Sequence, residues 1–197
     1  MVPTKTIMQC DEFDPAAGAI PELSSIDAFH DDRGYFNVAW SRKFSVLGRI
    51  AQVNHSYSQQ NTLRGMHWQV PPYAVGKYVK CIRGKIKDVL VDLRRSSQTF
   101  GHWKAYTLCD ASNCSFSEAL WVPPGFAHGF LAESPEVDVM YLQTGEYKPS
   151  AERSLLFNDP TVGIKWSTTM ADDQFIISDK DRNASLLLEL TEDDLFA

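Results

Sequence analysis

The sequence predicts an all-β sandwich or barrel, built as a single domain over residues 1–197. Short segments rich in β-branched and aromatic residues follow one another from about residue 50 to about residue 156. Turn clusters separate them at roughly 8 to 12 residues, a spacing typical of sandwiches and barrels. No repeat, low-complexity tract or linker-like run interrupts the chain, so no domain boundary is expected.

The clearest strand signals lie in the middle of the chain. Segments 78–82 and 85–93 flank Arg83-Gly84, a tight-turn centre, and are predicted to form a hairpin. In WVPPGFAHGF the two prolines are expected to end one strand, and the glycines to permit a sharp return. Three more strand-like segments are separated by turn clusters such as DASNCS and ESPE: 102–109, 118–124 and 137–147.

The two ends of the chain differ from this pattern. The first 30 residues carry no clear element, and we expect them to supply an extra strand or to exchange with a partner subunit. At the other end, the apolar spacing of ASLLLELTEDDLFA (184–197) is consistent with one short helix. Helices are therefore expected only at the periphery of the fold.

Composition excludes several classes of function. The chain has 19 basic and 25 acidic residues, a net charge of −6, so nucleic acid is not an expected partner. No stretch approaches the roughly 18 apolar residues of a membrane span. The start, MVPTKTIMQCDEFD, lacks the apolar run of a signal peptide, so we expect no membrane partner and a cytoplasmic location. The four cysteines show no C-x-x-C spacing and are expected to be reduced thiols.

His67, within LRGMHWQVPP, is the first candidate for chemistry, because histidine titrates near physiological pH. Three roles are open for His67. It is a structural sheet histidine that bonds a backbone carbonyl, or a metal ligand, or a general base. A metal site needs companion ligands, but Gly65 and Gln69 stand two residues to either side, and His128 is the only other candidate in a similar setting. No metal is therefore expected. A base needs an orienting acid, which this stretch alone does not identify.

Other candidate residues are ambiguous by themselves. Arg64 and Lys77 flank His67 and are either solvated surface charges or a source of positive charge for a developing enolate. Tyr141 and Tyr147 are by default strand aromatics, and SDKD (178–181) is by default a polar turn. The residues alone thus indicate a β-barrel with a candidate histidine site.

Seven motifs, taken in order, give a more specific indication. They are DDRGYF (31–36), QVNHSYS (52–58), LRGMHWQVPP (63–72), GKYVKCIRGKIKDVLVDLRRSSQTFG (76–101), WVPPGFAHGF (121–130), MYLQTGEYKPSAER (140–153) and NDPTVGIKW (158–166). Together they resemble the dTDP-4-dehydrorhamnose 3,5-epimerase family over about residues 25–182. Each motif alone is weak, but seven in the family's order make the resemblance specific.

The resemblance implies a cupin-type jelly-roll barrel with a few short peripheral helices and no metal or organic cofactor. It also implies a homodimer whose N-terminal strands are exchanged, so that part of each site comes from the partner subunit. The implied activity inverts C3 and C5 of a nucleotide-linked 4-keto-6-deoxy hexose, as in the conversion of dTDP-4-dehydro-6-deoxyglucose to dTDP-4-dehydrorhamnose for cell-surface polysaccharide.

The same resemblance implies four catalytic roles. His67 matches the base that removes the proton next to the ketone, and Asp181, in ISDKD, matches the aspartate that orients this base. Tyr141 matches the acid that reprotonates the opposite face. Lys77 matches the lysine that stabilises the enolate oxygen.

Further residues match substrate-binding positions of the family. Arg64 and His128 are expected near the diphosphate, with Arg33 as an anion-binding arginine from the partner subunit. Tyr147 matches the aromatic that stacks on the thymine ring. The remaining matches are polar ligand contacts: Gln52, Asn54, Glu152 and Lys180.

The chain departs from the family pattern at Val38, which stands where the motif RGFFxE has glutamate. Loss of a hydrogen-bond acceptor changes which ligand a site accepts, so the nucleotide and the sugar are left open. Three alternatives also stay open: an epimerase of C3 only or C5 only, an enzyme for a UDP- or GDP-linked keto sugar, and a non-catalytic cupin that binds a sugar nucleotide.

Overall fold

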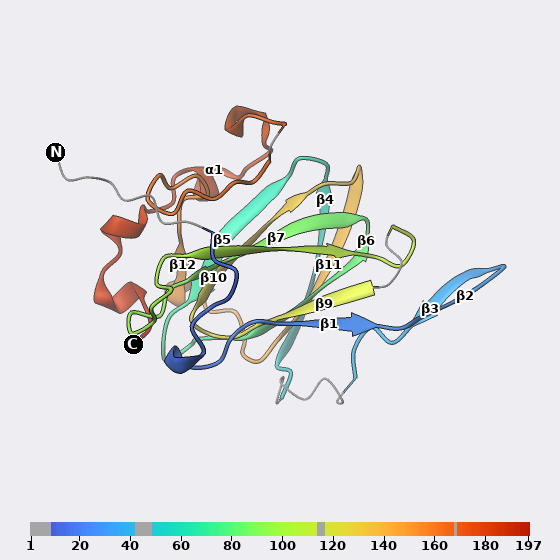
Figure 1. Ribbon diagram of the computed structural model, residues 1–197, viewed down its shortest axis with the longest axis horizontal. Helices are drawn as coiled ribbons and strands as arrows, with labels where there is room; N and C mark the ends of the chain where they lie inside the picture. Colours follow the sequence, from blue (N-terminus) through green and yellow to red (C-terminus); the bar gives the residue numbers. More distant parts are fainter. Residues whose placement is uncertain (1–8, 42–48, 114–116, 168) are drawn as a thin grey trace.

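The computed structural model describes residues 9–41, 49–113, 117–167 and 169–197, and there it confirms the all-β prediction (Figure 1). Two five-stranded antiparallel sheets face each other. The first has the order β1 (Glu22–Ile26), β9 (Ser117–Val122), β6 (Lys77–Arg83), β11 (Glu136–Gln143), β4 (Gln52–Gln59). The second has the order β12 (Glu152–Ser154), β5 (Leu63–Gln69), β10 (Phe126–Ala132), β7 (Lys85–Asp92), β8 (Trp103–Cys109).

Apolar side chains cover both faces of the second sheet. Because successive side chains of a strand point to opposite faces, Leu90 of β7 enters the core between the sheets, while Val89 and Val91 enter a second cluster on the outer face. The C-terminal segment covers this outer cluster with side chains that include Leu155 and Trp166. This covering explains why β7 has apolar residues on consecutive positions.

The predicted strands over 78–93 are present, but the predicted hairpin is wrong. β6 and β7 are consecutive in the chain, yet they belong to different sheets and do not pair with each other. Cys81 of β6 and Ile86 of β7 instead pack in the same core cluster between the sheets. Gly84, with φ +83°, makes the connection, so the chain crosses from one sheet to the other instead of folding back beside itself.

The single C-terminal helix predicted over 184–197 is also not formed. This segment carries two separate 3-10 turns, η5 (Leu187–Glu189) and η6 (Glu192–Asp194). Trp68 Nε1 donates to the carbonyl of Asp194 at 2.7 Å, so contacts with the barrel replace helical hydrogen bonds. The other short peripheral helices are η1 (Pro15–Ala17), η3 (Pro149–Ala151), η4 (Asp172–Gln174) and α1 (Asp179–Arg182).

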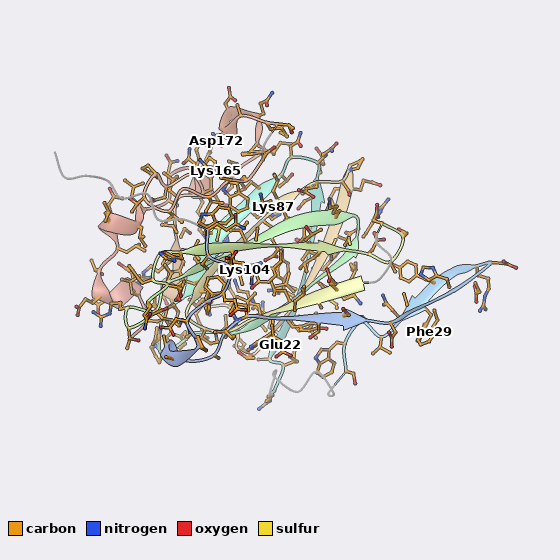
Figure 2. The ribbon with its side chains drawn as sticks, in the orientation of Figure 1. Glu22, Phe29, Lys87, Lys104, Lys165 and Asp172 are labelled. Carbon is orange, nitrogen blue, oxygen red and sulfur yellow. The ribbon has the colours of Figure 1, made fainter. Side chains whose placement is uncertain are left out.

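The N-terminal region supplies an extra strand, as one of the two expectations had it. β1 pairs with β9 at the edge of the first sheet. Next in the chain, β2 (Ala28–Asp31) and β3 (Gly34–Asn37) form a two-stranded arm that projects away from the barrel (Figure 1). Phe29 and Phe36 face each other across the arm and are 64% and 68% exposed; Phe29 is labelled in Figure 2. The arm therefore carries apolar surface that the described residues of its own chain do not cover.

The cysteine prediction is corrected at one position. Cys109 is disulfide-bonded, whereas Cys10 and Cys81 are free thiols. The absence of C-x-x-C spacing argues against a framework of bridges and does not exclude a single bridge. In the described residues no helix is both long and apolar enough to cross a membrane.

Candidate active site

A cavity of about 610 Å³ opens between the two sheets and gathers most of the predicted site residues. Ten of the twelve line it, and the side chains come from both sheets, from α1 and, for Tyr147, from the loop after β11. They are Asn54, Arg64, His67, Lys77, His128, Tyr141, Tyr147, Glu152, Lys180 and Asp181. Gln52 lies next to this group, and only Arg33 is remote from it.

His67 of β5 and Asp181 of α1 form a hydrogen-bonded pair. His67 Nε2 lies 2.7 Å from Asp181 Oδ1, and the backbone N–H of Gly65 donates to Asp181 Oδ2 at 3.2 Å. Burial raises the pKa of the Asp181 carboxyl, but the hydrogen bond and charge of His67, together with hydrogen bonds from Gly65 and Ser178, hold that pKa below its usual range. An ionised carboxylate only accepts, so Nε2 carries the hydrogen and the lone pair of His67 is on Nδ1.

This pair is built by local structure that the sequence reading treated as a turn. Ser178 is the N-cap of α1, and its side chain accepts from the backbone N–H of Asp181 at 3.1 Å. The cap therefore turns Asp181 inward, where it is 4% exposed and reaches His67.

Tyr141 enters the cavity from the opposite sheet, on β11. Its hydroxyl lies 3.2 Å from Ser56 Oγ of the neighbouring strand β4. Burial raises the pKa of Tyr141 above its ordinary value, so the phenol is protonated at neutral pH. The two sheets thus present a histidine lone pair and a protonated phenol to one cavity.

Lys77 lies at the start of β6 and lines the same cavity. Burial lowers the pKa of its ammonium to about 8, and the negative charges of Glu152 and Asp88 oppose that decrease. The side chain is therefore mostly cationic at pH 7 and loses its charge within one or two pH units above that.

His128 of β10 has its own acid, Asp88 of β7, which sequence reading missed. His128 Nε2 lies 2.8 Å from Asp88 Oδ2, and both residues are buried. Burial raises the pKa of Asp88, although His128 and Lys77 act in the opposite direction. The other oxygen, Oδ1, has no hydrogen-bond partner among the described residues. The sequence signal for Asp88 was a charged residue at an inward position of the apolar run KIKDVLVD.

Three of the expected binding residues form a cluster at the rim. Tyr147 donates its hydroxyl hydrogen to Glu152 Oε2 at 2.7 Å, and the Lys180 ammonium forms an ion pair with the same oxygen. The hydrogen bond to this carboxylate, together with burial, raises the pKa of Tyr147 to about 12. Gln52 joins the cluster because its Oε1 accepts from the Tyr147 backbone N–H at 2.9 Å, and its amide donates to Asn54.

The two arginines are placed differently. Arg64 is held by Ser58 Oγ at 2.9 Å and by the Tyr57 carbonyl at 2.8 Å, and it lines the cavity. Arg33 lies on the projecting arm, where it forms an ion pair with Asp31, and its side chain is 89% exposed. Val38, just beyond β3, is likewise outside the residues that line the cavity of its own chain.

Among the described residues, no group of three or more His, Cys, Asp or Glu side chains is arranged to hold a metal ion. The pairs His67–Asp181 and His128–Asp88 are each closed by a hydrogen bond within the pair, and so is a third pair, His55–Asp138. The chemistry that these residues support is proton transfer.

Fold and site together define an isomerase-type enzyme on a cupin-type β-barrel. A family model described as dTDP-4-dehydrorhamnose 3,5-epimerase matches residues 19–189. The chain belongs to the dTDP-4-dehydrorhamnose 3,5-epimerase family, which confirms the resemblance seen in the motifs.

Individual relatives agree with this assignment. The dTDP-4-dehydrorhamnose 3,5-epimerase of Salmonella typhimurium is 39% identical over 176 residues, 86% of this chain and 92% of the relative. A dTDP-4-dehydrorhamnose 3-epimerase of Streptomyces niveus is 36% identical over 90% of this chain and 79% of the relative. A crystal structure of the 3,5-epimerase of Legionella pneumophila with dTDP-4-keto-L-rhamnose superposes with a TM-score of 0.80, at 32% identity, over 89% of this chain and 92% of that one.

Proposed function

We propose that the protein inverts C3 and C5 of a nucleotide-linked 4-keto-6-deoxy hexose, converting dTDP-4-dehydro-6-deoxyglucose to dTDP-4-dehydrorhamnose. The observation that carries this proposal is that His67 and Tyr141 reach one cavity from opposite sheets. Inversion of a carbon next to a ketone needs a base on one face of the sugar ring and an acid on the other.

Each step of the proposed chemistry uses a group described above. His67 Nδ1 takes the proton from C3 or C5, and Asp181 stabilises the imidazolium that forms. The negative charge of the enolate rests largely on O4, where the Lys77 ammonium balances it. Tyr141 then donates its proton to the opposite face of the carbon. The Tyr141 phenolate then takes a proton from solvent, and the His67 imidazolium releases its proton to solvent. Proton numbers therefore balance over a turnover.

Several residues support a dTDP group as the carrier of the sugar. Arg64, fixed by Ser58 and Tyr57, suits a diphosphate, because its planar fork matches phosphate oxygens. Tyr147, at the exposed rim, offers a flat face for thymine. The Legionella relative was crystallised with a dTDP-linked keto sugar, which supports the same assignment. Within this proposal no cofactor takes part, and the enzyme works in the cytoplasm.

The direct test is incubation with dTDP-4-dehydro-6-deoxyglucose in heavy water, followed by NMR of the sugar protons. We expect deuterium at both C3 and C5, with dTDP-4-dehydrorhamnose as the product. Exchange at C3 alone would assign the protein to the activity named for the Streptomyces niveus relative. Exchange only with a UDP- or GDP-linked analogue would overturn the dTDP assignment and direct attention to Val38. Binding without any exchange would favour the non-catalytic alternative.

Lys77 makes the rate depend on pH in a defined direction. Its lowered pKa of about 8 means that the cation is present below pH 8 and is lost as the pH rises through this value. We therefore expect kcat/KM to decrease above pH 8, on the order of tenfold per pH unit. Lys77→Arg, which stays charged, should remove this decrease, whatever its rate at pH 7. The same decrease in Lys77→Arg would assign the titration to another group.

We propose that the protein is a homodimer in which the β2–β3 arm of each subunit enters the partner's site. The uncovered Phe29 and Phe36 and the distance of Arg33 from its own cavity support this exchange. A heterodimer of Arg33→Ala and His67→Asn chains, isolated through two different tags, should have about half the wild-type rate, because one of its two sites is intact.

A matched control distinguishes arm exchange from simple mixing. A heterodimer of His67→Asn and Tyr141→Phe should stay inactive, because both residues line the cavity of their own chain and each site keeps one lesion. An Arg33/His67 heterodimer as inactive as its parents would contradict arm exchange.

A further inference from the structure

Strand β5 changes the direction of its side chains within the site. Gln69 and His67 line the cavity, whereas Trp68 and Met66 pack in the outer cluster, although Trp68 also borders the cavity. Three residues before His67, however, Arg64 also lines the cavity. In a regular strand two residues at an odd separation point to opposite faces.

A β-bulge between these positions explains the change. On β10, His128 pairs with His67 and Phe130 with Arg64, so a step of two residues on β10 faces a step of three on β5. The extra residue shifts the alternation by one, which brings both Arg64 and His67 to the cavity side. The bulge contains Gly65 and Met66, and Gly129 lies opposite them.

We infer that Gly65 and Gly129 are positioning residues of the active site: their close approach forms the bulge that aims Arg64 and His67 into one cavity and directs the Gly65 N–H at Asp181. This inference rests on the proposed function, and it adds to it the part of the backbone that sets the geometry of the base.

The two glycines meet with no room for a side chain. A Cβ on Gly65 would lie 2.5 Å from the Cα of Gly129 and 2.7 Å from the carbonyl oxygen of His128. A Cβ on Gly129 would lie 2.7 Å from the carbonyl oxygen of Arg64 and 2.8 Å from the sulfur of Met66. Gly65 also has φ +115°, a conformation that other residues rarely adopt. Glycine is therefore needed on both strands for different reasons.

The bulge also holds Asp181, the carboxylate that pairs with His67. Asp181 Oδ1 receives His67 Nε2, and Asp181 Oδ2 receives the Gly65 N–H at 3.2 Å. One short backbone segment therefore sets the side-chain direction of His67 and also holds Asp181 through a main-chain hydrogen bond. Any movement of β5 away from β10 changes both contacts together.

The test compares Gly65→Ala and Gly129→Ala with Gly84→Ala. Gly84 is a matched control because it also has positive φ and backbone crowding, its Cβ falling 2.4 Å from the Glu136 carbonyl oxygen, yet it does not line the cavity. Three quantities are measured in each folded variant: kcat and KM for proton exchange, and the downfield proton NMR signal of the His67–Asp181 hydrogen bond, assigned by its absence in His67→Asn.

We expect kcat to fall about 100-fold in Gly129→Ala and in Gly65→Ala, since a misplacement of about 1 Å has effects of this size. KM should change less than kcat in Gly129→Ala, because Ser58 and Tyr57 of β4 also hold the Arg64 guanidinium, whereas His67 has no such support from β4 among the described residues. The downfield signal should shift or disappear in both variants and persist in Gly84→Ala.

Unchanged kcat and an unchanged signal in Gly129→Ala would overturn the inference, as would an equal loss of kcat in Gly84→Ala. Failure of the proposed function is seen separately, as absence of exchange in the wild-type protein. The NMR signal still tests the positioning role in that case, because it does not depend on a substrate.

Discussion

Replacement of His67 by asparagine is expected to decrease deuterium incorporation at both C3 and C5 by about 10²- to 10⁴-fold, the usual contribution of a general base. His67 lines the cavity, and its lone pair is on Nδ1 because Asp181 engages Nε2. Asparagine keeps a polar group of similar reach but cannot accept the proton at neutral pH. Heavy-water NMR with dTDP-4-dehydro-6-deoxyglucose measures the loss.

Binding of dTDP should be nearly unchanged in the same variant, because the groups assigned to the nucleotide, Arg64 and Tyr147, do not depend on His67 for their contacts. His102→Asn is the control, since His102 does not line the cavity and should leave the rate at the wild-type value. Wild-type exchange at either carbon in His67→Asn would remove His67 as the base for that carbon.

Tyr141→Phe is expected to separate proton exchange from inversion. Without the phenol, the enolate formed by His67 is reprotonated from the His67 face, and deuterium still enters because the imidazolium exchanges its proton with heavy water before returning it. Product formation should decrease by about 10²- to 10⁴-fold, because the proton donor on the opposite face is missing. NMR measures both quantities in one experiment, as deuterium in the recovered substrate and as the amount of inverted product.

Tyr106→Phe serves as the comparison, since Tyr106 packs near the inner core on β8 and does not line the cavity. It should keep both rates at wild-type values. Inversion at the wild-type rate in Tyr141→Phe would exclude Tyr141 as the acid. Loss of exchange and inversion by the same factor would assign it a positioning role instead.

Local sequence predicted the strands well because their signals are local. Alternation, β-branched residues and turn clusters located the strands now seen at Trp103–Cys109, Ser117–Val122 and Glu136–Gln143. Pairing is not local, and there the prediction was wrong: Arg83-Gly84 has the composition of a hairpin turn but carries the chain from one sheet to the other. Turn residues specify a change of direction and do not determine which strands become neighbours.

The helix prediction for the C-terminal segment was wrong for a related reason. Its apolar spacing fits one helix, but Leu187 and Phe196 are both buried in the outer cluster while Leu188 is 76% exposed. A segment tied to a barrel at several points takes the conformation that satisfies those contacts, and a helix of this length gains little by itself.

For the candidate site, the motifs indicated the residues, and the structure added their partners. His67 and Asp181 are separated by 114 positions, yet their side chains meet at 2.7 Å. No rule based on residue spacing predicts such a contact. Asp88 was missed because its partner His128 is 40 positions away, on a strand whose neighbour could not be known. The roles of these residues in catalysis stay predictions until the variants are measured.

The sequence by itself determined the fold class, the family and the residue types available for proton transfer, because strand periodicity and ordered motifs are properties of neighbouring positions. Only the tertiary structure decided that His67 and Tyr141 come from opposite sheets, that Arg33 is remote from its own cavity, and that Arg64 and His67 share one face of β5. The physical reason for the last is a single extra residue opposite Gly129, which reverses the alternation of the strand through a backbone pairing that the sequence does not display.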